Sequence, residues 1–87
     1  MHLDLYTSAF CAPCAAARRV VGEAQRLVPA LEVRELDVAA HPDRVEALGI
    51  RSTPTIVISG ADGDEVFRAA GVPRPDQLLT ALARALP

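Results

Sequence analysis

Phe10-Cys11-Ala12-Pro13-Cys14 contains both cysteines of this 87-residue chain, separated by two residues. The preceding segment, Leu3-Asp4-Leu5-Tyr6, predicts a short β-strand, and the following segment, Ala15 to Val28, predicts a helix. The cysteine pair therefore lies where a strand gives way to a helix. Backbone N–H groups and the helix dipole both stabilise a thiolate at such a position, so the placement favours a reactive dithiol.

The composition predicts one domain, residues 1–87, with a compact core, since 51% of the residues are hydrophobic. A formal net charge of −2 argues against nucleic acid or an anionic membrane as a partner. No targeting segment or membrane span is visible, so we expect the protein to stay in the cytoplasm. We also expect a monomer. A structural disulfide is disfavoured in a reducing compartment, and the pair is better explained by chemistry.

The periodicity of the remaining chain predicts the element order βαβαββα. After the first strand and helix we expect a strand over Leu31–Leu36, a short helix opened by His41-Pro42, strands over Thr55–Ser59 and Glu65–Ala69, and a helix after Pro73-Arg74-Pro75-Asp76. A right-handed crossover makes the first two strands parallel, and Asp62-Gly63 predicts a hairpin between the last two. The expected α/β fold is a four-stranded mixed sheet. Its first and last helices cover one face and the middle helix covers the other.

Apolar positions at helical spacing identify the expected core. They are Ala17, Val20, Val21, Ala24, Leu27 and Val28 in the first helix and Leu78, Leu79, Leu82 and Leu86 in the last. We expect the side chain of Asp4 to be solvated.

The ordered motifs resemble the thioredoxin-like superfamily over nearly the whole chain. A Cys-x-x-Cys motif follows the first strand, and Gly49-Ile50-Arg51-Ser52-Thr53-Pro54-Thr55 is similar to the family's approach to its cis-proline loop. Gly71 followed by Gln77-Leu78 has the family's spacing before the last helix. The resemblance implies a thioredoxin-like fold and a cis Thr53–Pro54 bond facing Cys11.

Several residues depart from the thioredoxin pattern. Only ten residues precede Cys11, so the extra N-terminal strand and helix of full-length thioredoxins are not expected. Phe10 and Ala12 stand where thioredoxins usually have Trp and Gly, and Leu5 occupies the position of their buried acid. Thr53 is typical of glutaredoxins, but their Gly-Gly segment and the aromatic residue between the cysteines are absent. The closest description is a minimal thioredoxin with a glutaredoxin-sized body.

Cys11, at the helix start, is the predicted nucleophile, and Cys14, one turn further in, is the predicted resolving thiol. The predicted function is reduction of protein disulfides through a mixed disulfide, without a cofactor or metal. Arg18 lies two turns along the helix and is expected to be too remote to affect Cys11 strongly. The predicted substrate-binding residues are Phe10, Ala12, Pro13, Thr53, Pro54 and Gly71.

Other interpretations stay open at this point. The cysteines could form half of a zinc site completed by His2 and His41, or ligate an iron–sulfur cluster shared between subunits, although Pro13 counts against a cluster. The fold could also serve as a binding or adaptor module without turnover, or as a glutathione-dependent glutaredoxin. We favour protein disulfides as substrates and a reductase of the thioredoxin-reductase type, rather than glutathione, as the electron donor.

Overall fold

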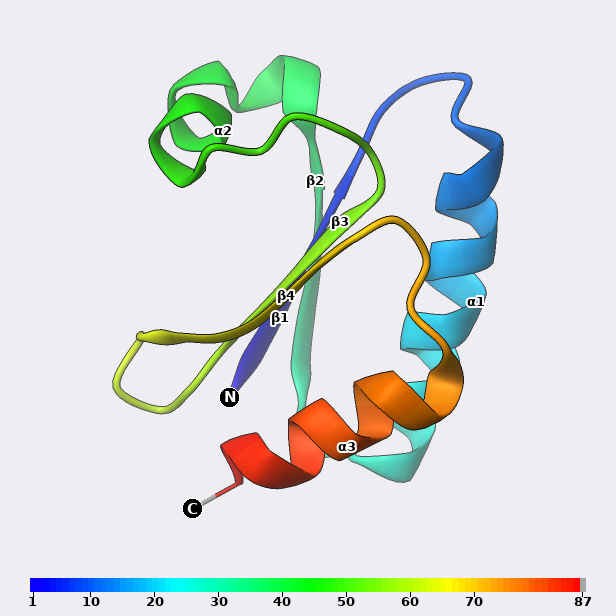
Figure 1. Ribbon diagram of the computed structural model, residues 1–87, viewed down its shortest axis with the longest axis vertical. Coiled ribbons are helices and arrows are strands. Elements are labelled where there is room, and N and C mark those ends of the chain that lie inside the picture. The colour runs from blue at the N-terminus through cyan, green and yellow to red at the C-terminus, as the bar shows by residue number, and fades with distance from the viewer. Residues whose placement is uncertain (87) are drawn as a thin grey trace.

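The computed structural model describes residues 1–86, and its elements follow the predicted order (Figure 1). The strands are β1 (His2–Thr7), β2 (Glu32–Asp37), β3 (Thr55–Ser59) and β4 (Glu65–Ala70); the helices are α1 (Ala12–Leu27), α2 (Pro42–Leu48) and α3 (Pro75–Ala85), and a 3-10 turn spans Val38–Ala40. No helix within residues 1–86 is long and apolar enough to cross a membrane.

The four strands form one mixed sheet in the order β2-β1-β3-β4. β1 and β2 are parallel, whereas β3 is antiparallel to both β1 and β4. The parallel pair needs a crossover, which α1 supplies, and β3 and β4 form the predicted hairpin. The sheet topology therefore agrees with the sequence prediction.

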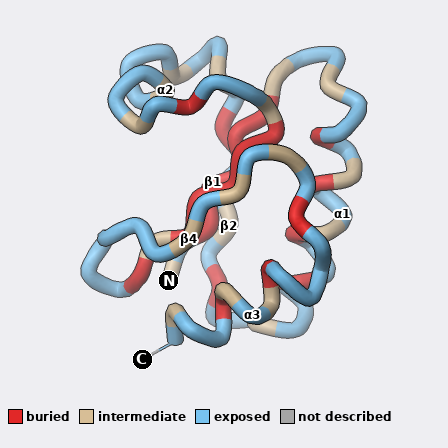
Figure 2. Tube along the Cα trace, viewed as in Figure 1, coloured by how far each residue is buried: buried red, intermediate tan, exposed pale blue. Residues whose placement is uncertain are grey.

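The two faces of the sheet are covered by different helices, as predicted (Figure 1). One face packs Leu3, Leu5, Ile56 and Ile58 against α1 and α3, and this is the larger core cluster. The other face packs a smaller cluster, Tyr6, Leu36, Ile50 and Val57, beneath α2. Figure 2 shows the buried residues concentrated along the central strands, with α2 and the β3–β4 turn largely exposed.

α1 begins at Ala12 rather than at Ala15, because Cys11 acts as its N-cap. Two leucines predicted for the core are instead exposed. Leu27 is 61% exposed and Leu86 is 49% exposed. Leu27 is the last residue of α1, and Leu86 follows the end of α3. The helical spacing therefore continues to positions where the helix ends and no longer packs against the sheet.

The prediction that Asp4 is solvated is wrong, because its side chain is only 8% exposed. Arg34 on β2 donates two hydrogen bonds of 3.0 Å to its carboxylate, and Arg44 on α2 donates another of 3.1 Å. Arg44 also donates to the hydroxyl of the buried Tyr6 at 2.8 Å. Asp4 faces the α2 side of the sheet, where two half-exposed guanidinium groups cover it.

Candidate active site

One end of the sheet gathers the segments that the sequence analysis singled out; it lies at the top in Figure 1. β1 ends at Thr7 and β3 begins at Thr55, and the two strands are neighbours in the sheet. The loop that leads to the cysteines and the loop before β3 therefore meet. The hydroxyl groups of Ser8 and Thr53 join the two loops through a hydrogen bond of 2.6 Å.

The two cysteines occupy the first turn of α1 in different environments. Cys11 is the N-cap and is partly exposed, whereas Cys14 is 0% exposed. They are joined as a disulfide, with Cα atoms 5.3 Å apart. The backbone N–H of Cys14 lies 3.2 Å from the Cys11 sulfur and donates to it. This N–H group and the N-terminal end of the helix dipole favour negative charge on Cys11 when the pair is reduced.

Phe10 presents an apolar ring in the same hollow as Cys11. Its backbone is left-handed, with φ of 57°, and its side chain is fully exposed. A hollow of about 590 Å³ opens next to it, lined by Ser8, Ala9, Phe10, Cys11, Ala12 and Arg18. We call this the Cys11 hollow. Three of its residues were predicted from the sequence: Phe10, Cys11 and Ala12.

The loop before β3 carries the remaining predicted residues. The Thr53–Pro54 bond is cis, as predicted, and Pro54 is buried. The N–H of Gly71, which follows β4, donates to the Pro54 carbonyl at 2.8 Å. Gly71 has φ of 95°, a backbone conformation that favours glycine. Pro13 is exposed on the first turn of α1 and does not line the Cys11 hollow.

An ion pair borders the Cys11 hollow on the side of β2. Arg18 donates from Nε and Nη2 to Glu35 at 2.9 Å, and the buried Thr7 donates its hydroxyl to the same carboxylate at 3.1 Å. The hydrogen bond from Arg18 lowers the pKa of Glu35, assisted by Thr7, while partial burial acts in the opposite direction. Glu35 raises the pKa of Arg18 in turn, so both groups are charged at neutral pH.

Sequence reasoning missed Ser8 and Glu35. It placed Arg18 two helical turns from Cys11, a spacing that puts both residues on one side of α1, but did not identify Arg18 as part of the wall of the Cys11 hollow. Ser8 bonds to Thr53, 45 residues away in the chain, and Glu35 bonds to Arg18 and Thr7, 17 and 28 residues away. No local sequence pattern reveals such contacts.

The zinc interpretation finds no supporting geometry. Within residues 1–86, no group of three or more His, Cys, Asp or Glu side chains gathers in a way that could hold a metal ion. His2 instead lies 3.2 Å from Glu32 on the neighbouring strand, and His41 precedes α2 as its N-cap residue.

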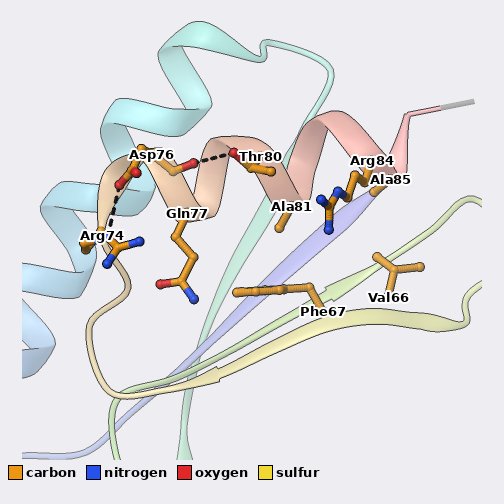
Figure 3. A pocket seen from close by; sticks show the side chains of 9 residues that line it. All are labelled: Val66, Phe67, Arg74, Asp76, Gln77, Thr80, Ala81, Arg84 and Ala85. Carbon is orange, nitrogen blue, oxygen red and sulfur yellow. Dashed lines mark hydrogen bonds and ion pairs between the residues drawn. The ribbon is translucent and has the colours of Figure 1, made fainter.

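A separate hollow of about 510 Å³ lies between β4 and α3 (Figure 3). Phe67 forms its floor beneath Ala81, and Gln77 points toward the ring. Arg74 and Asp76, which pair at 3.3 Å, stand at its rim. Its lining contains neither cysteine nor histidine, so it offers no nucleophile for thiol chemistry.

Comparison with known proteins gives a consistent result. The family model described as a thioredoxin-like domain matches residues 5–86. The chain is 38% identical to a thioredoxin of Methanocaldococcus jannaschii over 87 residues, covering 99% of this chain and 96% of that protein. It is 29% identical to a thioredoxin of Chlamydia muridarum, covering 86% of this chain and 72% of that protein.

Solved structures show the same fold. Thioredoxin 1 from Thermosipho africanus superposes with a TM-score of 0.83 at 17% identity, covering 97% of this chain and 92% of that chain. Mitochondrial thioredoxin 3 from Saccharomyces cerevisiae superposes with a TM-score of 0.82 at 20% identity, covering 95% of this chain and 76% of that chain.

Proposed function

This chain belongs to the thioredoxin-like domain family and is a thiol–disulfide oxidoreductase, and we propose that it reduces disulfides in proteins with Cys11 as nucleophile. The observation that carries the proposal is the unequal environment of the two cysteines. Cys11 is partly exposed at the helix N-terminus and accepts a backbone hydrogen bond, whereas Cys14 is completely buried behind it. Only the first sulfur can meet the disulfide of another protein.

The reaction proceeds by two thiol–disulfide exchanges. The Cys11 thiolate attacks one sulfur of the substrate disulfide, forming a mixed disulfide and releasing the other substrate sulfur as a thiolate. Cys14 then loses its proton and attacks the Cys11 sulfur. The intramolecular disulfide forms, the second substrate thiolate leaves, and the two released thiolates take up protons. Two electrons have passed from the Cys11–Cys14 dithiol to the substrate.

The substrate segment lies in an extended conformation across the site. Phe10, Ala12 and Pro13 supply the apolar rim on one side, and Thr53, Pro54 and Gly71 form the other. The backbone of Thr53 pairs with the extended segment and aligns its sulfur with Cys11. The exposed ring of Phe10 supports this assignment, because an uncovered aromatic side chain beside a nucleophile is suited to contact with a partner.

The protein works as a single-domain monomer in the cytoplasm, and a flavoprotein of the thioredoxin-reductase type returns it to the dithiol form. The names of its relatives support this donor over glutathione, since both are thioredoxins. The sequence between the cysteines, Ala12-Pro13, also lacks the aromatic residue found in many glutaredoxins.

Coupled assays on a protein disulfide test the proposal. With NADPH and a thioredoxin reductase from the same organism we expect sustained turnover, and with glutathione and glutathione reductase little or none. Efficient turnover with glutathione alone would make the protein a glutaredoxin instead. No reduction with either donor or with a chemical dithiol would favour an adaptor module.

The Cys14→Ser variant tests the assigned roles separately. It should accumulate mixed disulfides with substrate proteins, because the second exchange has lost its nucleophile. If Cys11→Ser accumulated them instead, the two cysteines would have the opposite roles.

A further inference from the structure

The exposed side of α1 carries a concentration of positive charge that the proposed reaction does not use. Arg18, Arg19 and Arg26 lie on this helix, and Glu23 is its one acidic residue. The whole chain has a formal net charge of −2, so the positive charge on α1 is local. Arg26 pairs with Glu23 and Arg18 with Glu35, whereas no ion pair of Arg19 is found within residues 1–86.

These arginines border a shallow trough that continues from the active site. A hollow of about 420 Å³ along α1 is lined by Arg18, Arg19, Gly22, Glu23 and Arg26. Arg18 also lines the Cys11 hollow, so the two depressions meet at its side chain. We call the hollow along the helix the α1 trough.

Gly22 forms the floor of the α1 trough, and nothing inside the molecule requires a glycine there. It lies in the middle of α1, is exposed, and would meet no atom within 4 Å if it carried a Cβ. Glycine within a helix is unfavourable because it loses more conformational entropy than alanine on folding. Residues 18, 22 and 26 are spaced one turn apart, so the missing side chain opens the floor between two arginines.

We propose that the α1 trough binds an acidic, extended segment of the substrate protein, next to the cysteine that Cys11 attacks; this rests on the proposed function. The arginines supply charge complementarity to the acidic side chains, and Gly22 lets the substrate backbone approach the helix. Because the trough adjoins the Cys11 hollow, a single substrate segment can contact both.

The length of the trough sets the spacing of the acidic residues. Arg18 and Arg26 lie about 10 and 22 Å along the helix axis from Cys11. An extended segment rises about 3.3 Å per residue, so its acidic residues lie roughly three to seven positions from the reacting cysteine.

Activated peptides measure this preference without any electron donor. Each peptide has one cysteine as a mixed disulfide with pyridine-2-thiol, and carries glutamates at the third to seventh positions before or after the cysteine, or glutamines instead. In the Cys14→Ser background the Cys11 thiolate attacks the peptide sulfur, a new disulfide forms, and pyridine-2-thione is released and measured. The reaction stops there.

For one chain direction, the glutamate peptide should react roughly five- to tenfold faster than its glutamine counterpart at low salt. The ratio should approach one at high salt, because exposed charges are screened. Equal rates for glutamate and glutamine peptides in both directions would overturn the proposal. A failure of the proposed function is different, since the coupled assays on a protein disulfide would then show no reduction, whatever the ratio between the peptide rates.

Two double variants identify the surface responsible. Arg19→Glu with Arg26→Glu should abolish the preference or reverse it. Arg74→Glu with Arg84→Glu, the matched control at the two ends of α3 and outside the α1 trough, should retain it. Each double variant replaces one arginine paired with a nearby carboxylate and one for which no ion pair is found within residues 1–86. An equal loss in both would overturn the proposal, because it would reflect net charge alone.

Gly22→Gln tests the floor of the trough. The substitution should raise the Tm, since it removes a glycine from a helix, yet lower the glutamate-to-glutamine rate ratio at least about twofold by obstructing the trough. A higher Tm with an unchanged ratio would overturn the proposed backbone approach. Reactivity toward the neutral 2,2′-dithiodipyridine shows whether Cys11 itself has changed. If the trough variants lost activity only in the reductase-coupled assay and kept the glutamate preference, the trough would bind the electron donor, which would contradict the proposal.

Discussion

Phe10 exposes its whole side chain at the cysteine end of the sheet, whereas Leu3, Leu5 and Ile56 are buried in the body of the same sheet. At the cysteine end the backbone leaves regular geometry, with a left-handed Phe10 and a loop held by the Ser8–Thr53 hydrogen bond. In the body, the central strands β1 and β3 are buried along almost their whole length, and the buried residues of α1 and α3 recur at helical spacing. Stability and reactivity therefore depend on different residues, so substitutions should affect one without the other.

Cys11→Ser should separate reactivity from stability most strongly. It removes the nucleophile, so disulfide reduction should fall about a thousandfold or more. The partly exposed position fills no core space, so the Tm measured with both proteins reduced should change little. A variant that retained a tenth of the activity would show that the cysteine end has a second nucleophile.

Leu78→Ala should have the opposite effect. Leu78 is completely buried in the larger core, and its truncation should cost about 2–5 kcal/mol of unfolding free energy. The reactivity of Cys11 in the fraction that stays folded should be unchanged. Denaturant unfolding measures the first quantity and alkylation kinetics the second.

The exposed Leu27 provides the control for that substitution. Leu27→Ala should cost less than about 1 kcal/mol, because its side chain is largely in water. Similar losses for the two leucines would contradict the assigned core.

Asp4→Asn should have a smaller effect on the free energy of unfolding than Leu78→Ala. It should leave the reactivity of Cys11 unchanged, because Asp4 lies in the body of the sheet. Asparagine keeps the shape but loses the charge that holds Arg34 and Arg44, which costs about 1–2 kcal/mol. The loss stays below that of a fully buried ion pair because both arginines are half exposed and can turn to water. Asp64→Asn, at an exposed turn, should be neutral in the same unfolding experiment.

Glu35→Gln should give the smallest effect on the free energy of unfolding. Glu35 lies between the cysteine end and the body of the sheet. The folded pKa of Glu35 is lowered by Arg18, so the pair stabilises the protein above the unfolded pKa and loses this contribution as pH falls through the folded value. Both side chains are more than one-third exposed, so the contribution is about 0–1 kcal/mol. From pH 7 into the acid range, the free energy of unfolding should decrease less steeply for the variant than for the unmodified protein. Identical pH profiles would contradict the stabilising role of the pair.

The element order could be predicted because it depends on local periodicity, and the faces covered by the helices followed from that order and the right-handed crossover. The position of both cysteines at the start of α1 followed from the strand and helix patterns on either side of them. The prediction for Asp4 was wrong, because Arg34 and Arg44 reach it from 30 and 40 residues away in the chain. Leu27 was assigned to the core because helical spacing does not reveal where a helix leaves the sheet. The contact between Ser8 and Thr53 depends on the pairing of β1 with β3, which no local pattern specifies.

The unequal environment of Cys11 and Cys14 is the central claim, and competitive alkylation of the reduced protein tests it most directly. Limiting iodoacetamide near pH 7, followed by mass spectrometry of each cysteine peptide, gives both rates in one sample. Cys11 should be alkylated at least about tenfold faster, because it is exposed and its thiolate is stabilised at the helix N-terminus. Equal rates, or faster modification of Cys14, would contradict the account.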